Sequence, residues 1–210
     1  MKLYSYWRST TSFRVRIALN LKGLSYDYCP VDLVAGEQGS VSYTALNPGK
    51  GVPTLVLEDG TALTQSLAII DYLEAIAPEP QLLPAQPLLR ARVQAAAYTI
   101  AMDIHPVNNL RVMTYLKSQI GMDSAGQTAW FDRWMTEGFA AYRALLPQNT
   151  YFSFADTPTL ADICLVPQLY YAHRWGGGHD TLSAIARDRK HALSLTAFDQ
   201  ARLETQPSAS

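Results

Sequence analysis

Four prolines lie close together within residues 77–87 and divide the chain into two segments with different patterns. Proline neither continues a helix interior nor donates to a strand ladder, so this density predicts a linker between two structural regions. A length of 210 residues is compatible with one large domain or two small ones. We therefore predict two domains, over residues 1–82 and 88–210.

Strand and helix signals alternate in the first segment. Short runs rich in apolar and aromatic residues at 2–6 and 26–33 predict strands, and residues 13–22 between them have apolar side chains at helical spacing. The remaining signals are a loose region and then a hairpin turn at Asp59 and Gly60. The hairpin strands are predicted at 54–58 and 61–63, with a helix beginning at Gln65 and Ser66.

Helical signals dominate the second segment. Thr159 and Asp162 have the spacing of a capping box, in which both side chains bind the opening amides of a helix. This spacing favours a structural role for Asp162, which we leave outside the catalytic set. The predicted helices span residues 88–102, 125–146, 159–175, 181–187 and 197–203.

Charge and cysteine usage exclude several classes of function. Seventeen basic and eighteen acidic residues give a net charge of −1, and no basic stretch is interleaved with aromatic residues, so nucleic acid is an unexpected partner. No apolar run approaches the ~20 residues of a membrane span, and the N-terminus lacks the apolar core of a signal peptide. Cys29 and Cys164 lie far apart, and no histidine or cysteine has zinc spacing. We expect a cytoplasmic protein without a metal.

Several motifs in the same order resemble a known family. The segments at residues 52–55 (VPTL) and 65–73 (QSLAIIDYL) resemble the glutathione-binding half of the thioredoxin-like domain of glutathione transferases. The segments at 4–9 (YSYWRS) and 14–19 (RVRIAL) are similar to the zeta class of maleylacetoacetate and maleylpyruvate isomerases. The resemblance continues at residues 103–106 (DIHP), 108–109 (NN), 165–168 (LVPQ) and Arg174.

This resemblance implies the glutathione-transferase fold, in which a thioredoxin-like α/β domain is followed by an all-α helical domain. The first domain, residues 1–82, would bind glutathione as the cofactor. The second, residues 88–210, would carry much of the substrate site. The family also implies a homodimer with the site near the subunit interface.

Four hydroxyl residues, 9–12, open the first predicted helix. They fit helix capping, and a helix N-terminus also stabilises an anion. The resemblance implies that Ser9 holds the glutathione thiolate, with Arg8 and Thr11 also in the catalytic set. The zeta pattern often has a cysteine where this chain has Thr11. No protein thiol would then assist at this position, so the glutathione sulfur would add to the substrate alone.

Three further residues are implied to bind glutathione. Val52 precedes Pro53, and the resemblance favours a cis bond that lets the Val52 backbone pair with an extended ligand. Gln65 and Ser66 would hold the γ-glutamyl carboxylate at the start of their helix. Ser66 is also expected to cap that helix, a role that uses the same amides.

The substrate site is implied to be cationic. Arg8 and Arg174 would bind carboxylates, because guanidinium pairs with them bidentately; a surface ion pair and a helix C-terminal cation are the alternatives. His105, Asn108 and Arg111 would contact substrate, and His105 and Asn108 also glutathione. If the helix continues through Pro106, His105 and Asn108 share a face with Asn109. A capped helix joint at a dimer surface is the alternative for this cluster.

The resemblance implies a glutathione-dependent cis-trans isomerase of a small unsaturated keto-dicarboxylate. The most direct assignment is conversion of maleylacetoacetate to fumarylacetoacetate. Maleylpyruvate isomerase is the nearest alternative, because the sequence does not separate the two substrates. A transferase that conjugates apolar electrophiles would need an apolar site rather than three arginines. A non-enzymatic interaction module predicts loss of the thiolate hydroxyl, whereas Ser9 is present.

Overall fold

The computed structural model describes residues 1–148, 150–174 and 192–207. The chain forms two compact units, of which the first comprises Met1–Leu82 with Leu193–Ser210 and the second comprises Leu83–Ala192. The boundary after Leu82 lies within the proline-rich segment.

The C-terminal segment packs with the first unit, whereas the sequence led us to assign it to the helical domain. Asn20 donates from Nδ2 to the carbonyl oxygen of Ala197 at 2.9 Å. Arg16 donates from Nε to the carbonyl oxygen of Ala201 at 3.1 Å. Bonds to main-chain carbonyls have no signature in the sequence. The helical pattern of this segment was therefore the only guide to its domain, and it pointed to the helical one.

A four-stranded mixed sheet forms the centre of the first unit, in the order β2-β1-β3-β4. β1 is parallel to β2 and antiparallel to β3, and β3 and β4 form the predicted antiparallel hairpin. The strands are β1 (Lys2–Ser5), β2 (Asp27–Pro30), β3 (Thr54–Val56) and β4 (Ala62–Thr64). The parallel β1–β2 pair is connected through a helix, as a parallel connection requires.

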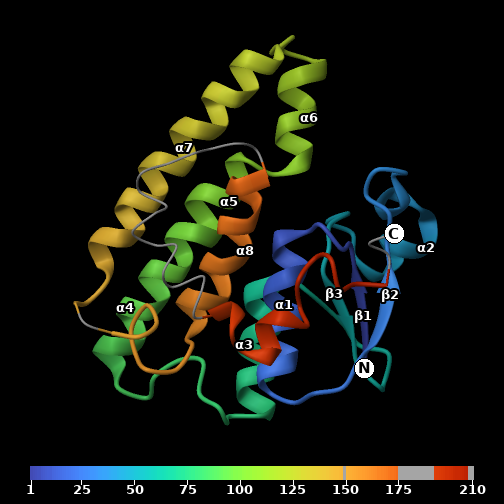
Figure 1. Cartoon of the computed structure of the whole chain (residues 1–210). Coiled ribbons are helices and arrows are strands. Elements are labelled where there is room, and N and C mark those ends of the chain that lie inside the picture. Colours follow the sequence, from blue (N-terminus) through green and yellow to red (C-terminus); the bar gives the residue numbers. More distant parts are fainter. Residues whose placement is uncertain (149, 175–191, 208–210) are drawn as a thin grey trace. The chain divides into compact units, whose positions relative to one another are not determined.

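Helices cover this sheet, with α1 and α3 side by side on one side of it and α2 on the other (Figure 1). α1 begins earlier than predicted, because Ser9 caps it. The region expected to be loose contains η1 and α2, of which only Tyr43 is buried, so no apolar periodicity marked them. The helical elements are α1 (Thr10–Leu21), η1 (Glu37–Gly39), α2 (Val41–Leu46), α3 (Ser66–Ile76) and α10 (Thr196–Asp199).

The core of the first unit lies between the sheet and the α1–α3 layer. Leu3 and Leu55 are register partners on β1 and β3, and neither has exposed surface. Phe13 and Ile17 of α1 and Leu73 of α3 are equally buried. Their burial fixes the rotation of α1, and with it the direction in which the N-terminus of α1 presents its hydroxyl residues.

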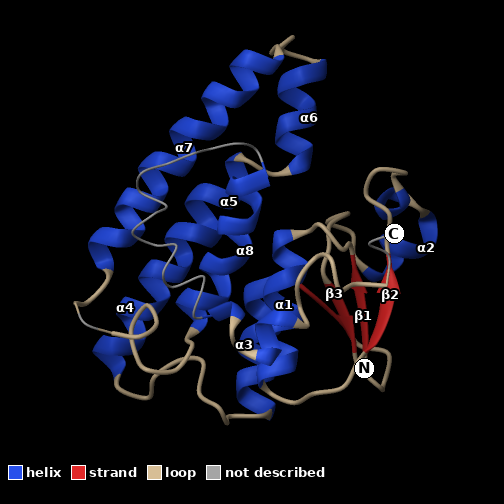
Figure 2. Ribbon diagram, in the orientation of Figure 1, coloured by secondary structure: helices blue, strands red, loops and turns tan. Residues whose placement is uncertain are grey.

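All regular secondary structure in the described residues of the second unit is helical (Figure 2). Its elements are α4 (Pro87–Tyr98), the π-helix η2 (Thr99–Ile104), α5 (His105–Val107), α6 (Leu110–Ser118), α7 (Ser124–Leu145) and α8 (Leu160–Arg174). The predicted helices at 88–102, 125–146 and 159–175 correspond to α4 with η2, α7 and α8. α6 was not predicted, α10 is shorter than the predicted helix at 197–203, and the helix predicted at 181–187 lies outside the described residues.

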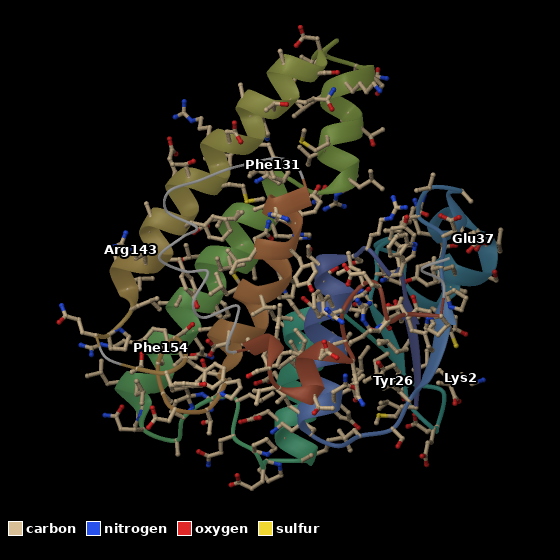
Figure 3. The ribbon with its side chains drawn as sticks, viewed as in Figure 1. Lys2, Tyr26, Glu37, Phe131, Arg143 and Phe154 are labelled. Carbon is tan, nitrogen blue, oxygen red and sulfur yellow. The ribbon has the colours of Figure 1, made fainter. Side chains whose placement is uncertain are left out.

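Close packing around α7 organises this unit. Phe131 lies between α7 and α8, with its ring centroid 5.1 Å from that of Tyr171 (Figure 3). Gly138 faces η2, where a Cβ atom would lie 2.2 Å from Cγ1 of Ile104. Only glycine therefore allows α7 to approach η2 this closely.

Candidate active site

The N-terminus of α1 begins at a tight turn after β1. The amide of Ser9 donates to the carbonyl oxygen of Tyr6 at 3.0 Å, and Oγ of Ser9 accepts from the amide of Ser12 at 3.2 Å. Ser9 is thus the N-cap of a twelve-residue helix, as the hydroxyl run predicted. Its partly exposed hydroxyl lies at the positive end of the helix dipole.

A chain of hydroxyl contacts connects Ser9 to the loop before β3. Oγ of Ser9 lies 2.8 Å from Oγ1 of Thr11, and Thr11 donates to the carbonyl oxygen of Val52 at 2.8 Å. The bond between Val52 and Pro53 is cis, as predicted. The structure thus brings Ser9, Thr11 and Val52 together.

The loop that carries Val52 is fixed from α2, by residues that the sequence did not single out. Oη of Tyr43 and Nδ2 of Asn47 both donate to the carbonyl oxygen of Gly51, and both lie 3.0 Å from Oγ1 of Thr54. Burial raises the pKa of Tyr43 above its ordinary value, so its hydroxyl keeps its proton. This network determines where the Val52 backbone is presented.

The start of α3 differs in one detail from the prediction. Gln65, not Ser66, is the N-cap residue, with φ of 68°, and its exposed side chain makes no capping hydrogen bond. Ser66 is the first residue of the helix and is buried, with Nη1 of Arg14 donating to its Oγ at 3.5 Å. The expected cap by Ser66 was therefore wrong, because the positive φ at Gln65 makes that residue the cap and the helix starts at Ser66, one residue earlier than a Ser66 cap would allow.

Arg8 occupies the turn directly before Ser9. Its guanidinium carbon lies 4.1 Å from the ring centroid of Trp7, a cation–π stack. The carbonyl of Trp7 accepts from Nη2 of Arg16 at 3.2 Å. Trp7 therefore orients Arg8, a role that the sequence suggested only through the aromatic residues before Arg8.

The cluster at residues 105–111 belongs to the second unit, and its helix does not run on. His105 opens the short α5, which ends before Asn108. Asn109 is the N-cap of α6, where its Oδ1 accepts from the amide of Val112 at 3.1 Å. The expectation of one continuous face with His105, Asn108 and Asn109 was therefore wrong, because the chain breaks and restarts between them.

Asn108 stabilises this break. It has no exposed surface, and its Nδ2 donates to the carbonyl oxygen of Ile104 at 3.0 Å. Its own carbonyl oxygen accepts from Oη of Tyr171 at 2.9 Å. Arg111, one turn later, is exposed on α6, and His105 is partly exposed. Arg174 is the last residue of α8, and its side chain lies outside what the structure describes.

Asp162 has the structural role that the capping-box spacing predicted. Its Oδ2 accepts from the amide and hydroxyl of Thr159 at 2.8 and 2.9 Å, and its Oδ1 accepts from the amide and hydroxyl of Ser153 at 2.9 and 2.7 Å. The carboxyl group is fully buried, and burial raises its pKa. It connects the start of α8 to the preceding loop.

Two kinds of feature are absent from the described part of the chain. None of the helices described there is long and apolar enough to cross a membrane. Likewise, no group of three histidine, cysteine, aspartate or glutamate side chains in residues 1–148, 150–174 and 192–207 is arranged to hold a metal ion.

Comparison with known proteins gives one consistent family. Residues 3–81 match the family model of the glutathione S-transferase N-terminal domain, and residues 128–194 match that of the C-terminal domain. A maleylacetoacetate isomerase of Pseudomonas aeruginosa is 45% identical over 99% of this chain and 98% of its own length.

Solved structures agree over the full length. The holo structure of a maleylpyruvate isomerase, described as a bacterial zeta-class glutathione S-transferase, has a TM-score of 0.96 at 44% identity, with 100% of both chains covered. A maleylacetoacetate isomerase from Methylobacterium extorquens AM1, solved with malonate and glutathione bound, has a TM-score of 0.95 at 35% identity, again with 100% of both chains covered. The chain therefore belongs to the glutathione S-transferase family and, within it, to the zeta-class group of maleylacetoacetate and maleylpyruvate isomerases.

Proposed function

We propose that this protein is a glutathione-dependent cis-trans isomerase of a small unsaturated keto-dicarboxylate, with maleylacetoacetate as the first candidate substrate. The observation that carries the proposal is the position of the Ser9 hydroxyl, at the N-terminus of α1 beside both Arg8 and the Val52 loop. The names of the relatives and the malonate and glutathione of the related structure support the same chemistry.

The first unit fits glutathione at three points. Val52 lies at the end of a loop fixed from α2, and its backbone would pair with the extended tripeptide. The side chain of Gln65 leaves the first turn of α3 uncapped, so the amides there would donate hydrogen bonds to a carboxylate. Ser66 would bind the same carboxylate with its hydroxyl.

Ser9 would stabilise the cofactor as an anion. When bound, glutathione supplies a thiolate that adds reversibly to the conjugated double bond, which permits rotation about that bond. Taking cysteine as the model, a thiol with a pKa near ~8.5 is only a few per cent ionised at neutral pH. Lowering this pKa by ~2 units requires about 2.7 kcal/mol, which a helix N-terminus and a hydroxyl donor together could supply.

Arg8 would bind one substrate carboxylate next to the reacting carbon atoms. Its guanidinium carbon lies 4.1 Å from the ring centroid of Trp7, and its planar fork of N–H groups would pair bidentately with a carboxylate. The family resemblance assigns Arg111 and Arg174 to the remaining negative charge of the dianion. These three arginines favour a dicarboxylate over an apolar electrophile.

His105 and Asn108 have different proposed roles. His105 is partly exposed at the start of α5, so its side chain can contact glutathione or substrate directly. Asn108 is fully buried and binds the carbonyl of Ile104, so we assign it to positioning of the α5–α6 break. Arg111 lies directly after that break.

We also propose that the enzyme works as a homodimer in the cytoplasm. Homodimers with two-fold symmetry are the commonest oligomers, and the family resemblance would imply a site near such an interface. Cys29 and Cys164 form no disulfide in the described structure, which suits a reducing compartment. Sedimentation that finds an active monomer at micromolar concentration would contradict the dimer.

The decisive experiment follows the loss of cis-enone absorbance with catalytic amounts of glutathione. Turnover without net loss of glutathione supports isomerisation, whereas stoichiometric consumption identifies a conjugating transferase. Maleylpyruvate is the second candidate substrate, because the relative with the TM-score of 0.96 carries that name. The ratio of kcat/KM for maleylacetoacetate and maleylpyruvate decides between the two.

A further inference from the structure

The hydroxyl hydrogens of Ser9 and Thr11 have only one consistent arrangement. Each hydroxyl has one hydrogen to donate. The carbonyl oxygen of Val52 can only accept, so the 2.8 Å bond from Thr11 uses the Thr11 hydrogen. The 2.8 Å contact between Ser9 and Thr11 must then use the hydrogen of Ser9. The hydrogen bonds therefore run from Ser9 to Thr11 to Val52.

The remaining bond to Ser9 agrees with this direction. The amide of Ser12 donates to Oγ of Ser9 at 3.2 Å, so Ser9 already accepts one hydrogen bond from its own helix. In this arrangement the hydroxyl hydrogen of Ser9 points to Thr11 and not to a ligand. A thiolate has no hydrogen and can only accept. Ser9 must therefore give up its bond to Thr11 before it can donate to sulfur.

We propose that Thr11 is a positioning residue that holds the hydroxyl hydrogen of Ser9 in the free site and competes with the glutathione sulfur for it. This inference rests on the proposed function. Thr11 does not itself donate to sulfur, because its hydrogen is bound to the carbonyl of Val52. Its effect on the cofactor is transmitted through Ser9.

Competition for one hydrogen predicts a measurable effect on the bound thiol. Removing the Thr11 oxygen removes this competing acceptor. Ser9 can then donate to the thiolate without first breaking its hydrogen bond to Thr11. From the usual strength of such a bond, the pKa of the bound thiol should fall by about half a unit to one unit. A direct bond from Thr11 to sulfur would predict the opposite sign.

The test compares Thr11→Val, which has nearly the same shape without the hydroxyl, with Thr11→Ser, which keeps it. The ultraviolet absorbance of the thiolate, titrated with pH in the complex with glutathione, gives the pKa. We expect a lower value for Thr11→Val and the value of the unmodified protein for Thr11→Ser. An unchanged or higher pKa in Thr11→Val would overturn the proposal.

The same titration in a Ser9→Ala background tests whether the effect passes through Ser9. There the Thr11→Val substitution should leave the pKa unchanged, and a persistent shift would overturn the proposal. Thr11→Ala is the second hydroxyl-free variant, for use if Thr11→Val does not fold, with the same expectation.

Calorimetry on the unmodified protein separates the proposed role of Thr11 from the proposed function. Glutathione binding without isomerisation refutes only the proposed function, whereas absence of binding refutes both.

Discussion

Nη2 of Arg16 donates to the carbonyl oxygen of Trp7 across 3.2 Å, from a side chain without exposed surface. Nη1 of the same guanidinium donates to Oγ of Ser5, and Nε to the carbonyl oxygen of Ala201, both at 3.1 Å. Burial lowers the pKa of Arg16 to about 10, which still leaves it charged at neutral pH. One buried cation thus connects β1, the turn before α1 and the C-terminal segment.

Arg16→Lys should destabilise the protein by about 2–4 kcal/mol, since breaking the hydrogen bonds of a buried charge is costly. An ammonium group cannot reach three acceptors that lie in different directions around a planar fork. Unfolding in denaturant measures the change. Ser5→Ala is the control, because it removes only one of the three acceptors and should cost less, about 1.5 kcal/mol. Equal midpoints for Arg16→Lys and the unmodified protein would contradict this role.

Arg8→Lys should lower kcat/KM for the dicarboxylate by about 10-fold to 100-fold, from the loss of a charged bidentate pair. Lysine keeps the charge but loses the planar fork, which in Arg8 also lies over the ring of Trp7. Steady-state kinetics measure the effect, and the unfolding midpoint should hardly change. The control is Arg133→Lys on the exposed surface of α7, where the arginine pairs with Glu137 at 3.3 Å. Full activity of Arg8→Lys would remove Arg8 from the substrate site.

Ser66→Ala should weaken glutathione binding by about 10-fold to 100-fold, the usual cost of one hydrogen bond to a charged group. Ser66 is buried at the first position of α3, where its hydroxyl and the helix amides would hold the same carboxylate. Calorimetry gives the dissociation constant. Ser118→Ala, at the exposed end of α6, should bind glutathione like the unmodified protein. Unchanged affinity in Ser66→Ala would place the carboxylate elsewhere.

The sequence was sufficient for elements whose pattern is local. α1 and the β3–β4 hairpin were predicted from apolar spacing and from the turn at Asp59 and Gly60. α2 was missed because it is short and buries only Tyr43, so its position depends on hydrogen bonds to Gly51 rather than on periodicity. Such contacts across the chain have no signature in the sequence around α2.

In the candidate site too, local features were predictable from the sequence and contacts between distant residues were not. Ser9 and Arg8 are neighbours in the sequence, so their proximity was certain once the helix start was recognised. The break at Asn108 was not predictable, because Pro106 is compatible with both a helix start and a kink. Arg16 lies in an apolar stretch of the sequence. A charged residue at such a position could have indicated a buried cation with several hydrogen-bond acceptors. The acceptors of Arg16 are mostly main-chain carbonyls, which only the folded structure reveals.

Asp162→Asn should destabilise the second unit by about 2–4 kcal/mol, because it leaves buried donors unpaired. The carboxylate accepts four hydrogen bonds, two from Ser153 and two from Thr159. An amide has the same shape, but its NH₂ group would face a backbone amide that can only donate. The start of α8 would lose its connection to the preceding loop.

Thermal and denaturant unfolding of Asp162→Asn measure this cost, and Asp156→Asn is the matched control. Asp156 lies in the same loop with an exposed side chain, so the same chemical change should alter the unfolding free energy by less than about 0.5 kcal/mol. Glutathione affinity should be unchanged in both variants, since the residues proposed to bind its thiolate and γ-glutamyl carboxylate lie in the first unit. Equal stability of the two variants would show that the buried carboxylate does not stabilise the start of α8.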